Sequence, residues 1–142
     1  MQELKNWLQE KGIAQYRSTQ IFKWLYLRLV SDFSEMTDLS KDFRTALDNE
    51  FFIESLKEKE RAESSDGTKK YLFELEDGHY IESVLIPEKD RSTLCISTQV
   101  GCAQGCKFCM TAKGGFIRNL SQSEITGQIV EVRRDIIKSG EE

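Results

Sequence analysis

The chain has 142 residues, of which 39% are hydrophobic and 31% charged, with a formal net charge of -4. This balance excludes a disordered polyelectrolyte, and the length suits one compact domain, or one small domain and part of another. No apolar run approaches the roughly 20 residues of a membrane-spanning helix, and the charged N-terminus is unlike a secretory signal peptide. We therefore expect a cytoplasmic protein whose 4 cysteines serve metal binding or catalysis rather than disulfide bonding.

The first third of the chain has the hydrophobic periodicity of α-helices. Gly12 is expected to end a first helix, Ser18 or Thr19 to cap a second, and Ser40 to cap a third. One apolar stripe along each helix forms its inward face. The stripes consist of Leu4, Trp7 and Leu8, then Ile21, Phe22, Leu25 and Leu29, and finally Phe43 and Leu47. We therefore expect a small helical part over residues 1–52.

Residues 53–90 change to an alternation of apolar and polar residues that predicts β-strands. The dipeptides Asp66-Gly67 and Asp77-Gly78 are hairpin turn signals. Pro87 closes the last strand, because proline cannot donate to a strand ladder. The pattern predicts an antiparallel meander of three strands.

The last third of the chain predicts a strand, a loop and a helix. A short run rich in β-forming residues, TLCIST, spans residues 93–98. Ser121 is expected to cap the closing helix, with Glu124 completing a capping box. At helical spacing, this helix is expected to bury Ile125, Ile129, Val132 and Ile136. Residues 91–142 thus predict one β-α unit.

Cys102, Cys106 and Cys109 lie in the loop between this strand and this helix, with the spacing CxxxCxxC. A 4Fe-4S cluster is usually held by four thiolates, so a loop with three cysteines leaves one iron open. In radical-SAM enzymes that iron binds the amino and carboxylate groups of S-adenosylmethionine, and electron transfer into the sulfonium yields a 5′-deoxyadenosyl radical. Gly101 and Gly105 allow the tight backbone turns that wrapping a cluster requires.

Two other interpretations of these cysteines stay open. Tetrahedral zinc usually takes two C-x2-C pairs, whereas only Cys106 and Cys109 form such a pair and His79 lies far upstream. Buried structural cysteines are the simplest alternative, although three in one short loop are dense for that role. A small zinc-bound regulatory protein is therefore the alternative to an iron–sulfur enzyme.

The sequence around the cysteines is more specific for one protein family than the cysteine triplet itself. Residues 82–133, which contain TLCISTQVGC and GFIRNLSQSEITGQI, resemble the radical-SAM RNA adenine carbon-2 methyltransferases. These dual-specificity enzymes act on 23S rRNA and on certain tRNAs, and a related branch that confers antibiotic resistance methylates carbon-8 instead. Upstream, YRSTQIFKWLY, MTDLSKDFR and DGTKKYLFELEDG extend the resemblance over essentially the whole chain.

The resemblance implies roles for individual residues. Cys102, Cys106 and Cys109 match the ligands of the 4Fe-4S cluster that binds S-adenosylmethionine. Glu82 matches the proton acceptor, and a place on an apolar strand face suits acid–base work. Cys95 matches a thiol that supports or resolves a methyl-cysteine intermediate, through a disulfide with a cysteine near the C-terminus. Without the resemblance, Glu82 would be a solvated strand residue and Cys95 a small buried one.

The implied fold is α+β, with an N-terminal accessory domain of helices and a small antiparallel meander, joined to the first β-α unit of a radical-SAM partial α/β barrel. Its boundaries fall at 1–52 for the RNA-binding helices, 53–90 for the meander and 91–142 for the truncated start of the core. The implied partners are 23S rRNA, tRNA and a reducing electron donor of the flavodoxin type, with no membrane and a monomeric state. Lys23, Arg28, Lys41 and Arg44 are candidates for phosphate contacts, and a solvated helix face is the simpler interpretation of each one taken singly.

Three parts of the family pattern are missing from this sequence. No cysteine follows Cys109, so the methyl-carrying thiol is absent. The remaining strands and helices of the barrel are missing too, since a full α/β barrel takes about 250 residues. The segments that bind S-adenosylmethionine are expected beyond residue 142. We therefore expect a fragment that does not methylate RNA on its own. An autonomous RNA-binding module with an inert cysteine tail is the alternative function.

Overall fold

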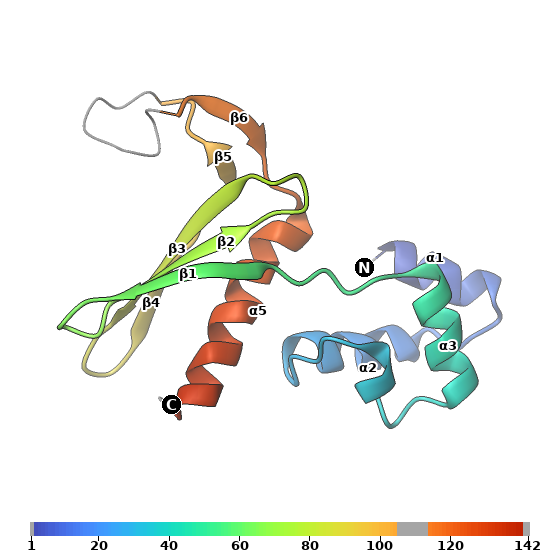
Figure 1. Cartoon of the computed structure of the whole chain (residues 1–142). Helices are drawn as coiled ribbons and strands as arrows, with labels where there is room; N and C mark the ends of the chain where they lie inside the picture. Colours follow the sequence, from blue (N-terminus) through green and yellow to red (C-terminus); the bar gives the residue numbers. More distant parts are fainter. Residues whose placement is uncertain (1, 105–113, 141–142) are drawn as a thin grey trace. The chain divides into compact units, whose positions relative to one another are not determined.

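The computed structural model describes residues 2–104 and 114–140 (Figure 1). Its helices are α1 (Gln2–Glu10), α2 (Tyr16–Tyr26), the 3-10 helix η1 (Phe33–Glu35), α3 (Lys41–Glu50) and α5 (Gln122–Ser139). Its strands are β1 (Lys57–Glu63), β2 (Lys69–Glu74), β3 (Tyr80–Pro87), β4 (Ser92–Cys95), β5 (Gln99–Gly101) and β6 (Phe116–Asn119). The chain divides into two compact units, residues 1–53 and 54–142. Among the described residues, no helix has the length and apolar character needed to cross a membrane.

The first unit packs α1, α2, η1 and α3 around an apolar core. The buried side chains of this core are Ile21, Trp24, Val30, Phe33, Met36, Leu39 and Leu47. Trp24 also donates its Nε1 hydrogen to a carboxylate oxygen of Asp38 at 2.6 Å, which ties α2 to the turn before α3. Trp7 of α1 meets Phe51 edge to face, with ring centroids 5.3 Å apart. The unit therefore combines apolar packing with polar links between segments that are distant in the sequence.

The starts of two helices test the capping predictions. Ser40 caps α3 as predicted, because its side chain accepts a hydrogen bond from a backbone N–H of the first turn. The prediction that Ser18 or Thr19 caps α2 is wrong, because the helix already begins at Tyr16. Ser18 is buried inside the helix, where its hydroxyl donates to a carbonyl one turn earlier, as serines within helices do. Leu29 lies beyond the end of α2, in a left-handed conformation with φ 57°.

The second unit contains a four-stranded antiparallel sheet in the order β1-β2-β3-β4. The predicted meander is present as β1, β2 and β3, and its two turns contain Gly67 and Gly78 with φ angles of 81° and 80°. The predicted number of strands is too small by one, because β4 also pairs with β3, with Cys95 opposite Val84. The segment TLCIST therefore contributes an edge strand to the antiparallel sheet.

The two outer strands of this sheet differ in character. β1 has the sequence KEKERAE and is exposed at every position. A register shift between Glu58 and Glu60 interrupts its pairing with β2. β4, at the opposite edge, has only 4 residues. The buried positions of the sheet therefore lie mainly on β2 and β3.

α5 covers one face of the sheet (Figure 1), and the two elements enclose the second apolar core. The buried side chains of this core are Leu56, Tyr71, Phe73, Leu75, Ile81, Leu85, Val100, Leu120 and Val132. Ser121 and Glu124 form the predicted capping box at the start of α5. Since a capping box satisfies two backbone N–H groups reciprocally, the first turn of α5 is well defined.

The inward face of α5 differs in part from the predicted one. Val132 is buried and Ile125 and Ile136 pack against the core, but Ile129 is 40% exposed. Gly127 and Gln128 are buried instead. A Cβ at position 127 would lie 3.1 Å from a side-chain carbon of Leu56, so a small residue lets the helix approach the start of the sheet closely.

Candidate functional site

β5 and β6, which flank the cysteine segment in the sequence, form a two-stranded antiparallel ribbon (Figure 1). The backbone N–H of Cys102 donates to the carbonyl of Gly115 at 3.1 Å. Gly101 has a φ of 71°, and a Cβ at this position would lie 1.7 Å from the same carbonyl oxygen. Only glycine fits such a position without displacing the backbone. The ribbon therefore joins the two ends of the loop at its base.

Of the three predicted cluster ligands, the structure describes only Cys102. Its thiol is free and half-buried. Cys106 and Cys109 lie outside the described residues, so their part in a cluster stays a prediction. Within residues 2–104 and 114–140, no three His, Cys, Asp or Glu side chains gather into a metal site. Gly101 has a positive φ, which allows a tight turn, and Gly105 lies outside the described residues, so the wrapping of a cluster by these glycines stays a prediction.

Glu82 shares one face of β3 with Tyr80, Val84 and Ile86, as the alternation predicts. That face is open to solvent, and the side chain of Glu82 is 47% exposed. The residues between these positions point to the core and are buried. The neighbours of Glu82 on this face are apolar, as expected, but the face lies open to solvent because α5 covers the opposite face of the sheet.

The strand register brings Glu82 and Cys95 onto the same face. Cys95 lies opposite Val84 across the β3–β4 pair, and Val84 follows Glu82 by two residues. Directly opposite residues of an antiparallel pair share a face, and diagonal neighbours on that face have Cα atoms about 7–8 Å apart. Cys95 is exposed and its thiol is free, so the alternative of a small buried residue is wrong. Lys70 lies opposite Val84 on the other side, with its Nζ 3.0 Å from Glu82 Oε1.

A polar network joins the ribbon to α5 and to the β2–β3 turn. Arg118 of β6 donates two hydrogen bonds to the Glu124 carboxylate, at 2.8 and 2.7 Å, and another to Asp77 at 2.7 Å. The bonds from Arg118 hold the pKa of both carboxyl groups below its ordinary value. The carboxylates in turn raise the pKa of the guanidinium. The local sequence indicates Glu124 only as a cap and carries no signal for Arg118, whose partner Asp77 lies 41 residues away.

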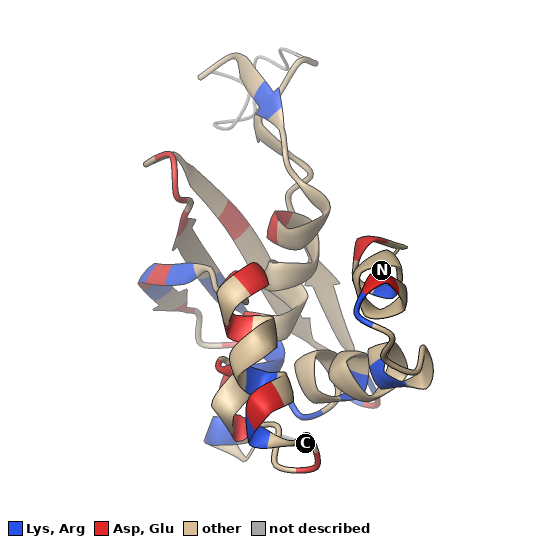
Figure 2. Ribbon diagram, turned by 90° about the vertical axis from the view of Figure 1, so that its right-hand side faces the viewer, with Lys and Arg blue, Asp and Glu red and all other residues tan. Residues whose placement is uncertain are grey.

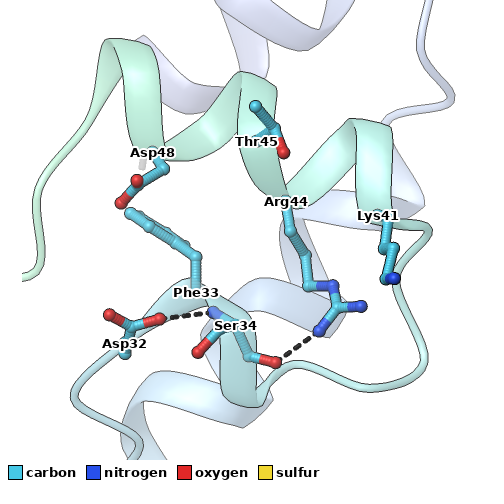
Figure 3. Close-up of a pocket in the computed structure, with 7 residues that line it drawn as sticks. All are labelled: Asp32, Phe33, Ser34, Lys41, Arg44, Thr45 and Asp48. Atoms are coloured by element: carbon cyan, nitrogen blue, oxygen red, sulfur yellow. Dashed lines mark hydrogen bonds between the residues drawn. The ribbon is translucent and has the colours of Figure 1, made fainter.

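Two of the four basic residues predicted to contact phosphate line one cleft on the helical unit. Lys41 and Arg44 of α3 border a cleft of about 320 Å³ (Figure 3). Figure 3 shows the Arg44 side chain reaching the backbone carbonyl of Ser34, to which it donates a hydrogen bond. Asp32 and Asp48 line the same cleft, so its charge is mixed. The two acidic residues equal the two basic ones in number, so the lining of the cleft has no excess of positive charge.

The other two predicted phosphate contacts, Lys23 and Arg28, lie at and beyond the last turn of α2. The guanidinium of Arg28 lies over the ring of Trp24, 4.1 Å from its centroid. At the other end of α2, Arg17 lies 5.1 Å from the ring centroid of Tyr16, which is 59% exposed. A basic side chain thus lies over an aromatic ring near each end of α2, whereas α5 mixes acidic with basic residues (Figure 2).

The fold, with Cys102 at the end of the β5–β6 ribbon, indicates the class of protein to which the structure is similar. The structure superposes on the crystal structure of a radical SAM methyltransferase from Sphaerobacter thermophilus with a TM-score of 0.86 and 40% sequence identity. The match covers 97% of this chain and 41% of that chain. This part of the molecule therefore has the fold of the corresponding part of a radical-SAM methyltransferase.

Sequence comparisons narrow the class to a family. Residues 1–59 match the model of the ribosomal RNA large subunit methyltransferase N-terminal domain. Over 125 residues the chain is 58% identical to the dual-specificity RNA methyltransferase RlmN of Desulfosudis oleivorans, which covers 88% of this chain and 34% of that protein. Over 134 residues it is 52% identical to RlmN of Geobacter sulfurreducens, which covers 94% of this chain and 37% of that protein. Over the stretch that it spans, the chain belongs to the dual-specificity RNA methyltransferase family.

The chain spans little more than a third of the length of these relatives. Their names describe complete proteins, so the activity and the substrates of the whole enzyme extend to this chain only as a proposal.

Proposed function

We propose that the protein is a radical-SAM RNA methyltransferase that methylates carbon-2 of a specific adenine in 23S rRNA and in certain tRNAs. The reaction uses two molecules of S-adenosylmethionine and a methyl-cysteine intermediate. The observation that carries the proposal is the shared exposed face of Glu82 and Cys95, in a chain related to such enzymes over most of its length.

Cys102, Cys106 and Cys109 are proposed to hold the 4Fe-4S cluster. Cys102 fits this role, since its thiol is free and half-buried and its backbone is tied to Gly115. A ligand in such a position reaches the metal while its surroundings limit access of solvent. When bound, the cluster would supply the electron that cleaves S-adenosylmethionine.

Glu82 is proposed to accept the proton that leaves the adenine carbon. Its carboxylate lies on the open face of the sheet, where a flat base can approach without disturbing the core. The ammonium group of Lys70, 3.0 Å away, orients the carboxylate. Cys95, exposed on the same face, is proposed to support or resolve the methyl-cysteine intermediate.

The helical unit is proposed to contribute RNA contacts. Lys23 and Lys41 would pair with phosphate, and the exposed ring of Tyr16 would stack on a base. The proposal includes a cytoplasmic, monomeric protein and an electron donor of the flavodoxin type.

Anaerobic reconstitution with iron and sulfide, followed by Mössbauer spectroscopy, tests the cluster. We expect a 4Fe-4S signal for the native chain and for Cys95→Ser, and its loss in Cys102→Ser. Zinc retained in place of the cluster in all three samples would contradict the proposal and favour the zinc-bound alternative.

A chimera tests the reaction. The chain, continued by the remaining segments of the Sphaerobacter thermophilus enzyme, is assayed on rRNA and tRNA, and the methylated position is mapped by mass spectrometry. We expect carbon-2 methylation, and a loss of at least about 100-fold in Glu82→Gln, as for removal of a general base. Methylation at carbon-8 would assign the chain to the other branch, and an unchanged rate in Glu82→Gln would remove its proposed role.

An autonomous RNA-binding module is the second candidate, favoured by the pairs of basic and aromatic side chains near the two ends of α2. A gel shift of the chain on rRNA fragments at two salt concentrations tests it. Binding should weaken as salt rises, since phosphate contacts release counterions. Lys23→Gln should weaken binding equally for different sequences, and absence of binding at low salt would exclude an autonomous module.

A further inference from the structure

Gln128 is an unusual residue for its position. It lies in the middle of α5, facing the sheet, and is wholly buried at 0% exposure. A buried amide is costly unless its hydrogen bonds are made. Here all four are made: Oε1 accepts from Ser83 Oγ at 2.7 Å and from the Ser97 N–H at 2.8 Å, and Nε2 donates to the carbonyls of Ser97 at 2.9 Å and Glu124 at 3.2 Å.

Two of these bonds imitate a strand partner. The side-chain amide of Gln128 pairs with both the N–H and the carbonyl of Ser97, just as a neighbouring strand would. β4 ends at Cys95, so Ser97 lies beyond the last residue of the regular ladder with β3. The hydroxyl of Ser97 continues the contact by donating to the Glu82 carbonyl at 2.7 Å.

A third bond of Gln128 reaches β3 directly. Ser83, buried next to Glu82 in the chain, donates its hydroxyl hydrogen to the same amide oxygen that holds Ser97. Gln128 therefore anchors both Ser83, which is next to Glu82, and Ser97, which lies two positions after Cys95. Such a fully satisfied buried network permits one arrangement and disfavours others.

We propose that Gln128 is a positioning residue that sets Glu82 and Cys95 in register on the exposed face of the sheet. The proposal rests on the proposed function, in which these two residues form part of the site. Gln128 lies beneath the opposite face and acts through Ser83 and Ser97.

A double-mutant cycle on thiol reactivity tests the proposal with the chain as it exists. The alkylation rates of Cys95 by neutral iodoacetamide and by anionic iodoacetate are measured by site-resolved mass spectrometry. Glu82→Gln should change the ratio of the two rates about threefold, the factor expected for one unit charge about 7 Å away in water. If Gln128 sets the register, this change should largely disappear when Gln128→Met is present.

Two further variants separate positioning from general stability. Tyr71→Phe removes a polar contact to α5 elsewhere on the sheet and should leave the threefold change intact. Ser97→Ala removes only the bond to the Glu82 carbonyl and should reduce the change, which covers the case in which Gln128→Met does not fold. A full threefold change in both Gln128→Met and Ser97→Ala would overturn the proposal, as would an equal loss in Tyr71→Phe.

The readout needs no iron, S-adenosylmethionine or RNA, so its outcome is independent of the proposed function. A chain that fails to take up a cluster but shows the coupling would retain the positioning role and lose the enzymatic one. A chain that takes up a cluster without the coupling would retain the enzymatic role and lose the positioning one.

Discussion

The two units of the chain differ in the kind of contact that stabilises the interior of each. The helical unit has a mainly apolar core, to which Trp24 adds one polar link. In the second unit, α5 sets polar side chains against the strands: Gln128 beneath β3, Glu124 on Arg118, and Asp135 on the Tyr71 hydroxyl at 2.7 Å. Apolar contacts are non-directional, whereas hydrogen bonds require a particular geometry. The strict register therefore lies in the unit that carries the proposed chemistry.

The largest effect should come from Phe73→Ala, in the second core. Phe73 is wholly buried, so truncation leaves a cavity and should lower the free energy of unfolding by about 3–5 kcal/mol. Hydrogen exchange followed by mass spectrometry should show the loss of protection in residues 54–142. Leu47→Ala is the matched change in the helical core, with about 2–5 kcal/mol lost in residues 1–53. Loss of protection in both units from either variant would show that they are one cooperative body.

Gly101→Ala should have the next largest effect, confined to the β5–β6 ribbon. The new methyl group would overlap the Gly115 carbonyl, and the positive φ adds strain, at a combined cost of about 3 kcal/mol. We expect faster hydrogen exchange at the Cys102 N–H and reduced iron uptake. Gly115→Ala is the control, since its φ is also positive but nothing lies within 4 Å of the added carbon. Equal effects from the two variants would show that strain alone, and not the close approach, decides the outcome.

Glu124→Gln should weaken the join between ribbon and helix by about 2 kcal/mol, as expected for hydrogen bonds to a charged group. Arg118 lowers the pKa of Glu124 in the folded state, so this stabilisation is present above the unfolded value of about 4.3. It is lost as pH falls through the folded value, because protonation breaks the ion pair. Urea unfolding between pH 7 and pH 3 should show a steeper fall for the native chain than for the variant. Parallel curves would assign the acid sensitivity to other groups.

The smallest effect should come from Ser40→Ala in the helical unit. Its side chain caps α3, and loss of a cap costs about 1 kcal/mol. The urea midpoint of residues 1–53 should fall while that of residues 54–142 stays constant. Ser40→Asp should restore the midpoint, since aspartate caps equally well, and failure to restore it would assign another role to the serine.

Local chemistry was predictable from the sequence. The Ser121–Glu124 capping box, the Ser40 cap and the glycines of the two hairpin turns each depend on residues within a few positions of one another. A signal of this kind needs no knowledge of distant segments. The start of α2 was less predictable, because Ser18 has the chemistry of a cap but its hydroxyl bonds within the helix instead.

The arrangement of the site was predictable only in part. The alternation on β3 placed Glu82 beside Tyr80 and Val84, but which face is open depends on α5, a separate element. Gln128 was missed because a polar residue in an amphipathic helix is normally assigned to the solvent side. Its partner Ser97 lies 31 residues away, and no local pattern encodes that contact.

The outer strand β1 has a consequence for how copies of the chain meet. A strand edge with unpaired N–H and carbonyl groups is a template on which another chain can add a strand. β1 presents KEKERAE there, with a shift in register between Glu58 and Glu60, and every residue exposed. Charged side chains and an interrupted ladder both discourage such addition. The edge is thus protected against aggregation by its own sequence, even though it lies open to water.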